Sequence, residues 1–348
     1  MIPVLAMAAV IWGVGVVFKT PVRLRLTLIA ALWLAVVLAQ LVLPDGNGFR
    51  QATGGDVRPW LALGVLGALV AGYRALVQSL RRRAAPKAET EPPQQGSFRA
   101  AELDRYARHI ILREIGGPGQ KKLKGAKVLV VGAGGLGSPA LLYLAASGVG
   151  TIGVIDADEV DNSNLQRQII HTDDRIGMPK VFSAEMAMKA LNPFIEVRAY
   201  HRRLDEESAA ALVADYDLVL DGTDNFDTRY LVNRVCVAAG KPLISAAITQ
   251  WEGQISLYDP VRGGPCYECV FPVRPAPGMV PTCAEAGVAA PLPGVIGTMM
   301  AMEAVKEITG AGQGLRGRLV IHDALYTETR VIAVKSRADC LVCGGQHG

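Results

Sequence analysis

Residues 127–137, which read KVLVVGAGGLG, decide the fold of this chain. A short apolar run leads directly into Gly132, and Gly132, Gly134 and Gly137 fit the pattern G-x-G-x-x-G. Residues 138–146 continue as a helix of small residues. Between a strand and a helix, such glycines let the backbone turn tightly and approach a nucleotide, while the helix start offers free N–H groups and a positive dipole. The stretch therefore predicts a nucleotide-binding unit, without saying which nucleotide it binds.

Acidic residues stand at the ends of two later apolar runs. A short strand leads into Asp156, a position from which a carboxylate can bond a ribose hydroxyl. Residues 217–220 lead into Asp221, and Asp224 follows shortly after it. An aspartate at the carboxyl end of a strand can hold Mg²⁺, and Asn, Arg and Lys residues nearby can neutralise a triphosphate. Asp221 could be this metal ligand, or it could cap the helix expected over residues 226–239.

Two other classes of nucleotide-binding protein fit the sequence less well. Hydride transfer needs neither the metal nor the cations, which counts against a nicotinamide or flavin oxidoreductase. The pattern G-x-x-x-x-G-K-[ST] occurs nowhere in the chain, which counts against a P-loop ATPase. Residues 98–348 alternate apolar strands with amphipathic helices, as α/β domains with crossover helices do. We therefore expect a Rossmann-like α/β domain over this range.

Charge and hydrophobicity are unevenly distributed along the chain. The 348 residues include 36 Lys and Arg and 32 Asp and Glu, and 50% of them are hydrophobic. Residues 1–95 hold ten of the basic and four of the acidic residues, so the rest of the chain is close to neutral. Nucleic acid is therefore not the expected partner. The high overall hydrophobicity indicates a segment bound to a membrane.

Three apolar runs, over residues 2–18, 26–43 and 60–80, supply that segment. About 20 apolar residues span a bilayer, so we expect three transmembrane helices within residues 1–83, with two as the alternative. The first run could instead be a cleaved signal peptide, or the runs could be buried helices of a soluble protein. Basic residues fill the first connection and follow the third run, which places both on the cytoplasmic side. Residues 84–97 are expected to be a flexible linker to a catalytic domain on the cytoplasmic face of a bacterial-type inner membrane.

Two Cys-x-x-Cys pairs of identical spacing predict a structural metal site. Their four thiolates can complete a tetrahedral zinc site without an open position; they belong to Cys266, Cys269, Cys340 and Cys343. A redox-active site needs only one such pair, and a disulfide is disfavoured in the cytoplasm. Cys283 follows the Pro-rich residues 272–281, and it could be a nucleophile near a helix start or a small loop residue.

Several of these motifs together resemble one known family. They are RYAR at 105–108, the glycine loop, Asp156, SNLQRQ at 163–168, DGTDN at 221–225 and the cysteine pairs. The chain resembles, over about residues 100–345, the molybdopterin-synthase and thiazole-biosynthesis adenylyltransferases, which are bacterial relatives of ubiquitin-activating enzymes. The resemblance implies an adenylation domain with a mixed sheet. It also implies that ATP adenylates the C-terminal glycine of a small ubiquitin-fold sulfur carrier, releasing pyrophosphate, in molybdenum cofactor or thiamine biosynthesis.

The resemblance also implies roles for charged residues of this chain. Asp224 would bind Mg²⁺. Arg167 would act on the phosphates as a finger that reaches across a homodimer, and Arg108 and Lys180 would neutralise the rest of the triphosphate. Cys283 would be the position at which sulfur-transferring relatives form a thioester or persulfide.

The expected nucleotide site combines the glycine loop with polar residues. Gly135 would pack against the nucleotide, Asp156 would hold the ribose, and Asn164 and Gln168 would line the phosphate site. The full expected set is Gly132, Gly134, Gly135, Gly137, Asp156, Asn164, Arg167, Gln168, Lys180 and Asp224.

The implied partners are the Gly-Gly tail of the carrier and a separate sulfur donor, since no rhodanese-type domain follows Cys343. A membrane-tethered carrier-binding module without catalysis is the alternative, and an NAD or FAD oxidoreductase is a weaker one.

Overall fold

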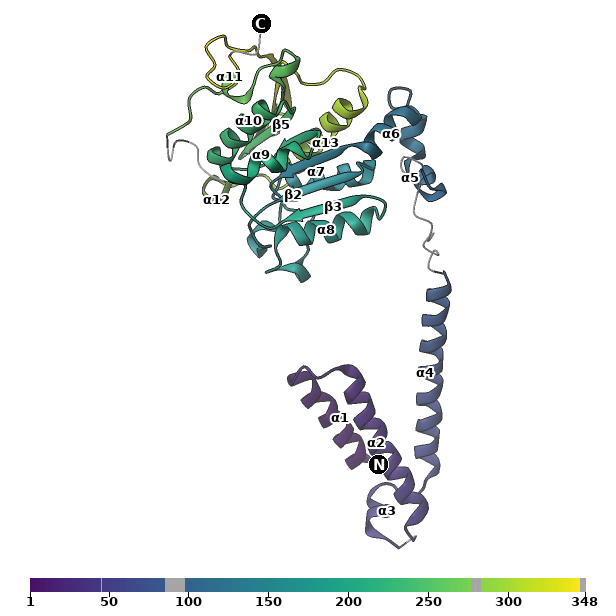
Figure 1. Cartoon of the computed structure of the whole chain (residues 1–348). Coiled ribbons are helices and arrows are strands. Elements are labelled where there is room, and N and C mark those ends of the chain that lie inside the picture. The colour runs from purple at the N-terminus through teal and green to yellow at the C-terminus, as the bar shows by residue number, and fades with distance from the viewer. Residues whose placement is uncertain (45, 85–97, 277–278, 280–282, 345–348) are drawn as a thin grey trace. The chain divides into compact units, whose positions relative to one another are not determined.

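The computed structural model describes the chain except residues 45, 85–97, 277–278, 280–282 and 345–348. The chain separates into two compact units, Met1–Glu91 and Pro92–Gly348 (Figure 1). The expected linker, 84–97, lies outside the described residues apart from Ala84, which ends a helix. Each unit has its own buried hydrophobic cluster.

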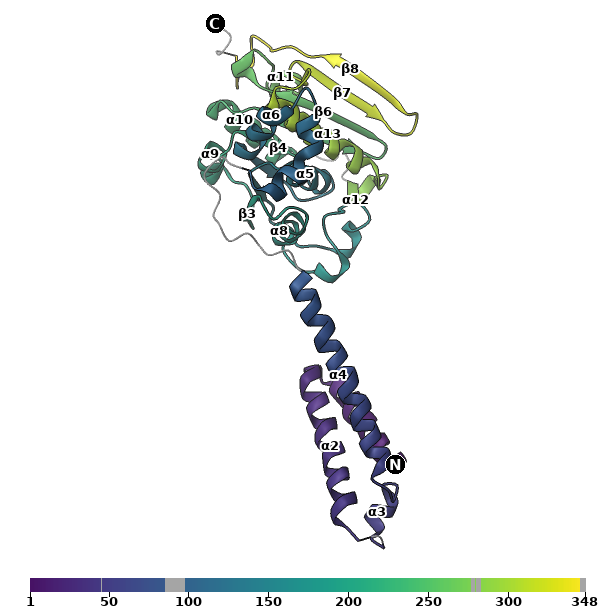
Figure 2. The same ribbon diagram turned by 90° about the vertical axis from the view of Figure 1, so that its right-hand side faces the viewer.

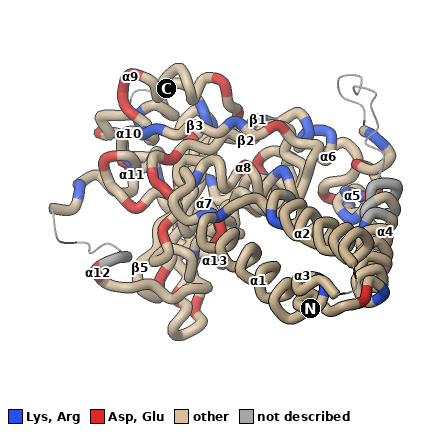
Figure 3. Tube along the Cα trace, turned by 90° about the horizontal axis from the view of Figure 1, so that it is seen from below, with Lys and Arg blue, Asp and Glu red and all other residues tan. Residues whose placement is uncertain are grey.

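The described residues of the first unit are mainly helical. The helices are α1 (Ile2–Val17), α2 (Val22–Val42), α3 (Gly48–Ala52) and α4 (Arg58–Ala84). The three apolar runs of the sequence therefore form helices, and α1 carries no charged residue (Figure 3). The short α3 is an addition to the predicted elements. It begins after Asn47, whose side-chain oxygen accepts a hydrogen bond from the N–H of Phe49 at 2.9 Å.

One helix among the described residues is long and apolar enough to cross a membrane. It covers Leu24–Val42, with a mean hydropathy of 2.1, and 17% of it is buried. α1 is apolar but has only 16 residues, fewer than the roughly 20 that a bilayer requires. α4 is interrupted by Arg74. By length and composition the structure supports one of the three expected spans.

The second unit is built on a mixed sheet of eight strands. Their order is β3-β2-β1-β4-β5-β6-β7-β8. Figure 2 shows β7 and β8 side by side at one end of this order. The strands are β1 (Lys127–Val131), β2 (Thr151–Ile155), β3 (Glu196–Tyr200), β4 (Leu218–Asp221), β5 (Leu243–Thr249), β6 (Glu252–Tyr258), β7 (Arg318–Asp323) and β8 (Glu328–Ala333). Strands β1 to β5 pair in parallel, and β6, β7 and β8 are added antiparallel. The predicted Rossmann-like α/β fold with a mixed sheet is confirmed.

Helices cover both faces of the sheet, and α7, α8, α9 and α10 connect its parallel strands. They are α5 (Ala100–Ile111), α6 (Gly116–Gly125), α7 (Gly137–Ser147), α8 (Lys180–Leu191), α9 (Glu206–Ala214), α10 (Phe226–Ala239), α11 (Tyr267–Val270), α12 (Cys283–Ala286) and α13 (Leu292–Thr309). Short 3-10 turns are η1 (Asn162–Asn164), η2 (Asp173–Arg175) and η3 (Pro260–Arg262). The crossover helices follow the parallel strands as the sequence pattern predicts.

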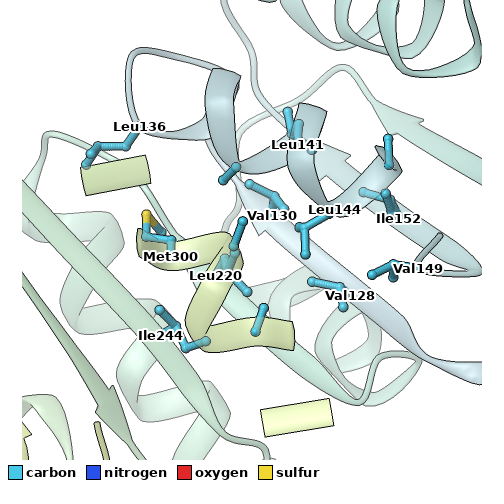
Figure 4. Close-up of a cluster of buried hydrophobic side chains, with 14 of the residues drawn as sticks. Val128, Val130, Leu136, Leu141, Leu144, Val149, Ile152, Leu220, Ile244 and Met300 are labelled. Carbon is cyan, nitrogen blue, oxygen red and sulfur yellow. The ribbon is translucent and has the colours of Figure 1, made fainter. Parts of the chain in front are cut away.

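The residues of β1 alternate between two hydrophobic cores. Val128 and Val130 pack with Leu144 of α7 and Met300 of α13 on one face (Figure 4). Leu129 packs on the opposite face, against α9 and α10. Both faces of a parallel strand are thus covered, which explains why β1 reads as a continuous apolar run rather than an alternating one.

The order of the strands brings three loops to one edge of the sheet. β1 lies between β2 and β4. The chain therefore passes from β1 to β2 on one side and later returns as β4 on the other side of β1. The N–H of Gly132 donates to Ile155 O at 2.9 Å, and the N–H of Gly222 donates to Val131 O at 3.0 Å. These bonds tie together the loops that follow β1, β2 and β4. Ligands of open α/β sheets bind at such a switch point.

Gly137 lets α7 begin immediately after the loop, and replacing it should destabilise the domain. A Cβ at Gly137 would lie 1.9 Å from Gly132 O, a contact that only a backbone shift could relieve. We expect Gly137→Ala to lower the free energy of unfolding by about 3 kcal/mol, measured by denaturant titration of the full chain.

Gly134→Ala is the matched control for stability. Its Cβ would meet Gln168 Nε2 at 3.7 Å, an ordinary contact. It should change the free energy of unfolding by less than about 1 kcal/mol. Equal effects of the two substitutions would contradict the packing described here.

Candidate active site

The loop between β1 and α7 offers backbone donors. Gly132 has a φ of 96°, a backbone conformation that residues with a side chain rarely adopt. Within the part of the chain that the structure describes, the N–H groups of Gly134, Gly135 and Leu136 have no hydrogen-bond acceptor. Unpaired N–H groups at the start of a helix bind phosphate oxygens. The loop therefore has the donors that a nucleotide phosphate needs.

Asp156 follows β2 and is bonded to the glycine loop. Its Oδ2 accepts a hydrogen bond from the N–H of Ala133 at 2.8 Å, and its Oδ1 accepts one from the N–H of Asp158 at 2.8 Å. Each carboxylate oxygen has more than one lone pair, so both can still accept from a ligand hydroxyl. Asp156 is half-buried beside the loop, a position compatible with the expected bond to a ribose.

Arg167 lies beside the glycine loop of its own chain. A Cβ at Gly135 would be 3.9 Å from Cγ of Arg167. The guanidinium group donates to Ser163 O at 3.2 Å and to Asn164 Oδ1 at 3.1 Å. The structure thus places the aliphatic part of Arg167 beside the loop of its own chain, whereas the resemblance implies that its guanidinium group reaches across a homodimer.

Gln168 brings an unpaired acceptor to the same place. The residue is 4% exposed, and its Nε2 donates to Asn164 Oδ1 at 3.0 Å. Its Oε1 is buried and has no hydrogen-bond partner among the described residues. A buried acceptor without a donor is costly, and a ligand hydroxyl would supply one. In this orientation Gln168 suits a ribose hydroxyl better than a phosphate oxygen, which cannot donate.

Lys180 is the first residue of α8, and it is held by an aspartate that the sequence motifs did not predict. Its ammonium group pairs with Asp158 Oδ2 at 2.8 Å. The side chain of Lys180 is 7% exposed, whereas that of Asp158 is 65% exposed. The pair anchors the lysine near Asp156, because only one residue separates the two aspartates.

His171 supports the glycine loop, although its sequence context gives no sign of a partner. Its Nε2 lies 2.9 Å from Ala133 O, and its Nδ1 lies 2.9 Å from Ser183 Oγ. Because a carbonyl oxygen can only accept, Nε2 carries the proton and Nδ1 accepts from the serine hydroxyl. Burial lowers the pKa of His171, so the ring is neutral at pH 7. His171 therefore connects the glycine loop to α8.

Asp221, the last residue of β4, and Asp224, which follows the strand, differ completely in their surroundings. Asp221 is fully buried and accepts hydrogen bonds from Thr223 and Ser245. Asp224 is exposed, and among the described residues it has no hydrogen-bond or ion-pair partner. Asn225, not Asp221, caps α10, with Oδ1 accepting from Thr228 N–H at 2.8 Å. Asp224 is thus the carboxylate that is available to a cation.

Arg108 lies on α5, apart from the glycine loop. Tyr106 of the same helix accepts a hydrogen bond from Asn192 Nδ2 at 2.7 Å and covers Gly148, where a Cβ would be 2.5 Å from its ring. Gly148 and Asn192 follow the carboxyl ends of α7 and α8, at the opposite edge of the sheet. Arg108 is exposed and makes no side-chain hydrogen bond or ion pair within the described part of the chain. The structure does not bring it to the other expected site residues of its own chain.

α13 closes the other side of the glycine loop. A Cβ at Gly135 would be 3.2 Å from Cβ of Pro293, and a Cβ at Gly297 would be 2.3 Å from Leu136 O. These close contacts fix the loop against the start of α13. Neither Pro293 nor Gly297 has a sequence motif that could have identified it.

The four cysteines of the two Cys-x-x-Cys pairs form one buried cluster. Cys266 Sγ lies 3.7 Å from Cys269 Sγ and 3.6 Å from Cys340 Sγ, and Cys269 Sγ lies 3.3 Å from Cys343 Sγ. All four sulfurs lie within 4.8 Å of one another. Bonds of about 2.3 Å to a central ion would put tetrahedral ligands about 3.8 Å apart. The predicted four-cysteine cluster is confirmed, and its geometry fits one tetrahedral ion.

The chemistry of the donors also fits a metal ion. Burial raises the pKa of the Cys266 thiol. A divalent cation would offset that cost by binding the thiolates. The side chain of Cys283, by contrast, lies outside the described residues, so its thioester or persulfide role stays a prediction.

The strand order and the loop at its switch point define a nucleotide-binding α/β protein. Residues 106–342 match the ThiF family. The chain is 49% identical over 249 residues to the "Sulfur carrier protein adenylyltransferase" of Thermus thermophilus, covering 70% of this chain and 92% of that protein. It is 47% identical over 248 residues to the "SAMP-activating enzyme E1" of Haloferax volcanii, covering 71% and 91%.

A solved structure shares the fold. E. coli MccB in its structure with ATP has a TM-score of 0.60 and 26% identity, covering 69% of this chain and 74% of that chain. The family match extends over more than half of the chain, and the relatives align over most of their own length. The chain therefore belongs to the ThiF family.

The cysteine cluster should carry one metal ion per chain. Cys343→Ser removes one ligand, and we expect it to lose the ion and to lower the melting temperature by about 10 °C, because binding free energy contributes to folding. Metal content is measured by mass spectrometry of the purified full chain, and stability by calorimetry.

Cys236→Ala is the control. Cys236 lies in α10, is 1% exposed and is outside the cluster. Its substitution therefore also removes a buried sulfur, but not one of the four in the cluster. It should keep the metal. An unchanged metal content in Cys343→Ser would contradict the assignment of the four ligands.

Proposed function

We propose that this chain uses ATP to adenylate the C-terminal glycine of a small ubiquitin-fold sulfur-carrier protein, with release of pyrophosphate. The observation that carries the proposal is membership of the ThiF family together with 49% identity to a sulfur carrier protein adenylyltransferase along 92% of its length. The carrier would enter through its Gly-Gly tail, as in molybdenum cofactor or thiamine biosynthesis. A separate protein would supply the sulfur.

The reaction requires neutralisation of negative charge and does not require a general base. An oxygen of the glycine carboxylate attacks the α-phosphorus of ATP, a new P–O bond forms, and the bond to the β-phosphate breaks. The nucleophile is already ionised, so the protein must mainly reduce the repulsion between two anions and hold them in line. The free N–H groups of the glycine loop, Arg167 and Lys180 are the groups that would do this. The triphosphate would compete with Asp158 for Lys180.

Mg²⁺ and zinc would have separate roles. Asp224 would hold Mg²⁺, because an exposed carboxylate without a partner suits a hard cation. The ion would supply further neutralisation of the triphosphate when bound. Zinc in the four-cysteine cluster would be structural, since four thiolates leave no open coordination position.

A homodimer would complete the site. Arg108 lies at the opposite edge of the sheet from the glycine loop of its own chain, exposed on α5. It could therefore reach a triphosphate only on a second copy. In this arrangement Arg167 acts within its own chain and Arg108 is the residue that crosses.

The first unit would anchor the protein in a bacterial-type inner membrane, with the adenylation domain on the cytoplasmic face. The apolar helix over Leu24–Val42 supports this placement, as do basic residues at positions 19, 23 and 25 and at 81–83. The large apolar side chains of α1, α2 and α4 are mostly exposed within the described residues, as in a lipid environment.

Exchange of labelled pyrophosphate into ATP tests the proposed reaction. We expect exchange that depends on a carrier, either a molybdopterin-synthase small subunit or a thiamine sulfur carrier, each with an intact Gly-Gly end. Asp224→Asn should reduce the rate by at least about 100-fold, because it removes the charge that holds the metal.

Mixing variants tests the dimer in the same assay. Arg108→Ala and Asp224→Asn should each be inactive, but their mixture should regain roughly a quarter of the activity, since mixed dimers contain one intact site.

ATP binding without exchange, with either carrier, would instead favour a tethered binding module.

Cell fractionation tests the anchor. The full chain should stay in the membrane fraction after an alkaline wash, because its apolar helices are held by lipid rather than by charge. A chain that begins at Phe98 should be found in the soluble fraction and should still catalyse exchange. Release of the full chain by the wash would contradict the anchor.

A further inference from the structure

A buried arginine holds the loop that carries Asp224. Arg229 lies in the first turn of α10 and is 6% exposed. Its NH2 group donates to Thr223 O and to Ala246 O, the latter at 2.7 Å. Its NH1 group donates to Ser245 Oγ at 3.1 Å. One guanidinium group thus joins α10 to β5 and to the loop after β4.

Asp221 holds the same loop from its other side. Its Oδ1 accepts from the N–H of Thr223 at 3.0 Å and from its hydroxyl at 2.7 Å. Its Oδ2 accepts from Ser245 Oγ at 3.0 Å and lies 3.7 Å from NH1 of Arg229. Thr223 is therefore held at its N–H and hydroxyl by Asp221 and at its carbonyl by Arg229.

The hydrogen bond to the carbonyl of Thr223 sets the direction of the next peptide. The carbonyl of Thr223 and the N–H of Asp224 belong to the same planar unit. Fixing that carbonyl removes one rotation that would otherwise change the direction of the backbone at Asp224. Thr223 itself contacts the glycine loop, because a Cβ at Gly132 would be 3.4 Å from its Cγ2.

Stability alone is a poor reason for this buried ion pair. A buried pair costs desolvation that apolar side chains would avoid, and well-packed hydrophobic replacements often stabilise a protein. Neither Arg229 nor Asp221 is exposed enough to bind a ligand directly. A planar guanidinium with donors in fixed directions suits the simultaneous binding of two carbonyls and a hydroxyl, which an ammonium group cannot reproduce.

We propose that Arg229 is a positioning residue that fixes the peptide bond between Thr223 and Asp224 and so presents Asp224 to Mg²⁺. It touches neither ATP nor the metal. This inference rests on the proposed function, since it assigns the orientation of the same aspartate.

ATP binding measured by calorimetry tests the inference without a carrier. The full chain, Arg229→Lys and Asp224→Asn are each titrated with ATP, once with saturating Mg²⁺ and once in EDTA. Mg²⁺ increases the affinity of the unmodified chain for ATP by some factor, and we expect this factor to be about tenfold smaller in Arg229→Lys. In EDTA, Arg229→Lys should bind ATP as the unmodified chain does. An unchanged gain from Mg²⁺ in Arg229→Lys would overturn the inference.

A double variant separates positioning from general destabilisation. If Arg229 acts through Asp224, then Arg229→Lys combined with Asp224→Asn should bind no more weakly than Asp224→Asn alone. A merely structural arginine would give losses that add, in EDTA as well as in Mg²⁺. Additive losses would therefore also overturn the inference.

Arg316→Lys is the matched control. Arg316 bonds the buried Asp259, with NH2 2.9 Å from Oδ2, in a network outside the Asp224 loop. Arg316→Lys should lower the melting temperature but keep the full gain in ATP affinity from Mg²⁺. Loss of that gain in Arg316→Lys would show that any destabilisation has the same effect, and it would overturn the inference.

Ser245→Ala decides the question if Arg229→Lys does not fold. It removes only the hydroxyl between Asp221 and Arg229, and we expect a loss of about threefold in the gain from Mg²⁺. If Ser245→Ala kept the full gain in affinity from Mg²⁺, the inference would be overturned. Failure of the unmodified chain to bind ATP at all would count against the proposed function instead.

Discussion

The site depends on the point where the chain leaves β1 for β2 and later returns beside β1 as β4. Backbone hydrogen bonds from Gly132 to Ile155 O and from Gly222 to Val131 O extend the sheet one residue beyond these strands. The three following loops therefore start from fixed positions at one edge. The free amides of the glycine loop, the carboxylate of Asp156 and the loop that carries Asp224 come to this edge because of strand order, although they are far apart in the sequence.

Features that local pattern and spacing specify were accessible from the sequence. The glycine loop is defined by a strand, three glycines and a helix within a few residues of one another, and α10 runs over the predicted range. The cysteine cluster was accessible for a different reason. Each Cys-x-x-Cys pair supplies only two of the four sulfurs that a tetrahedral site needs. That the two pairs lie together in the fold could therefore be inferred, although they are far apart in the sequence.

Features that depend on single residues from distant elements were not accessible. His171 meets Ala133 O, Pro293 meets Gly135, and Arg229 meets Ala246 O, and each contact exists only after the sheet has formed. A lone Arg or His has no period and no spacing partner, so it is usually interpreted as a surface or core residue. The same limit applies to Arg167, whose place beside Gly135 of its own chain exists only in the folded structure.

The four-cysteine cluster and the edge of the sheet that carries the glycine loop are linked through α10. Tyr267 lies between Cys266 and Cys269 in the sequence and donates its N–H to Asn233 Oδ1 of α10 at 2.8 Å. Its ring packs edge-on against that of Tyr230 of the same helix, with 5.4 Å between the ring centroids. Burial raises its pKa to about 12, so it enters this core as a neutral ring. The first turn of α10 carries Arg229. Ordering of the cysteine cluster therefore also fixes the helix from which the Asp224 loop is held, so the cluster contributes to the geometry of the site as well as to stability.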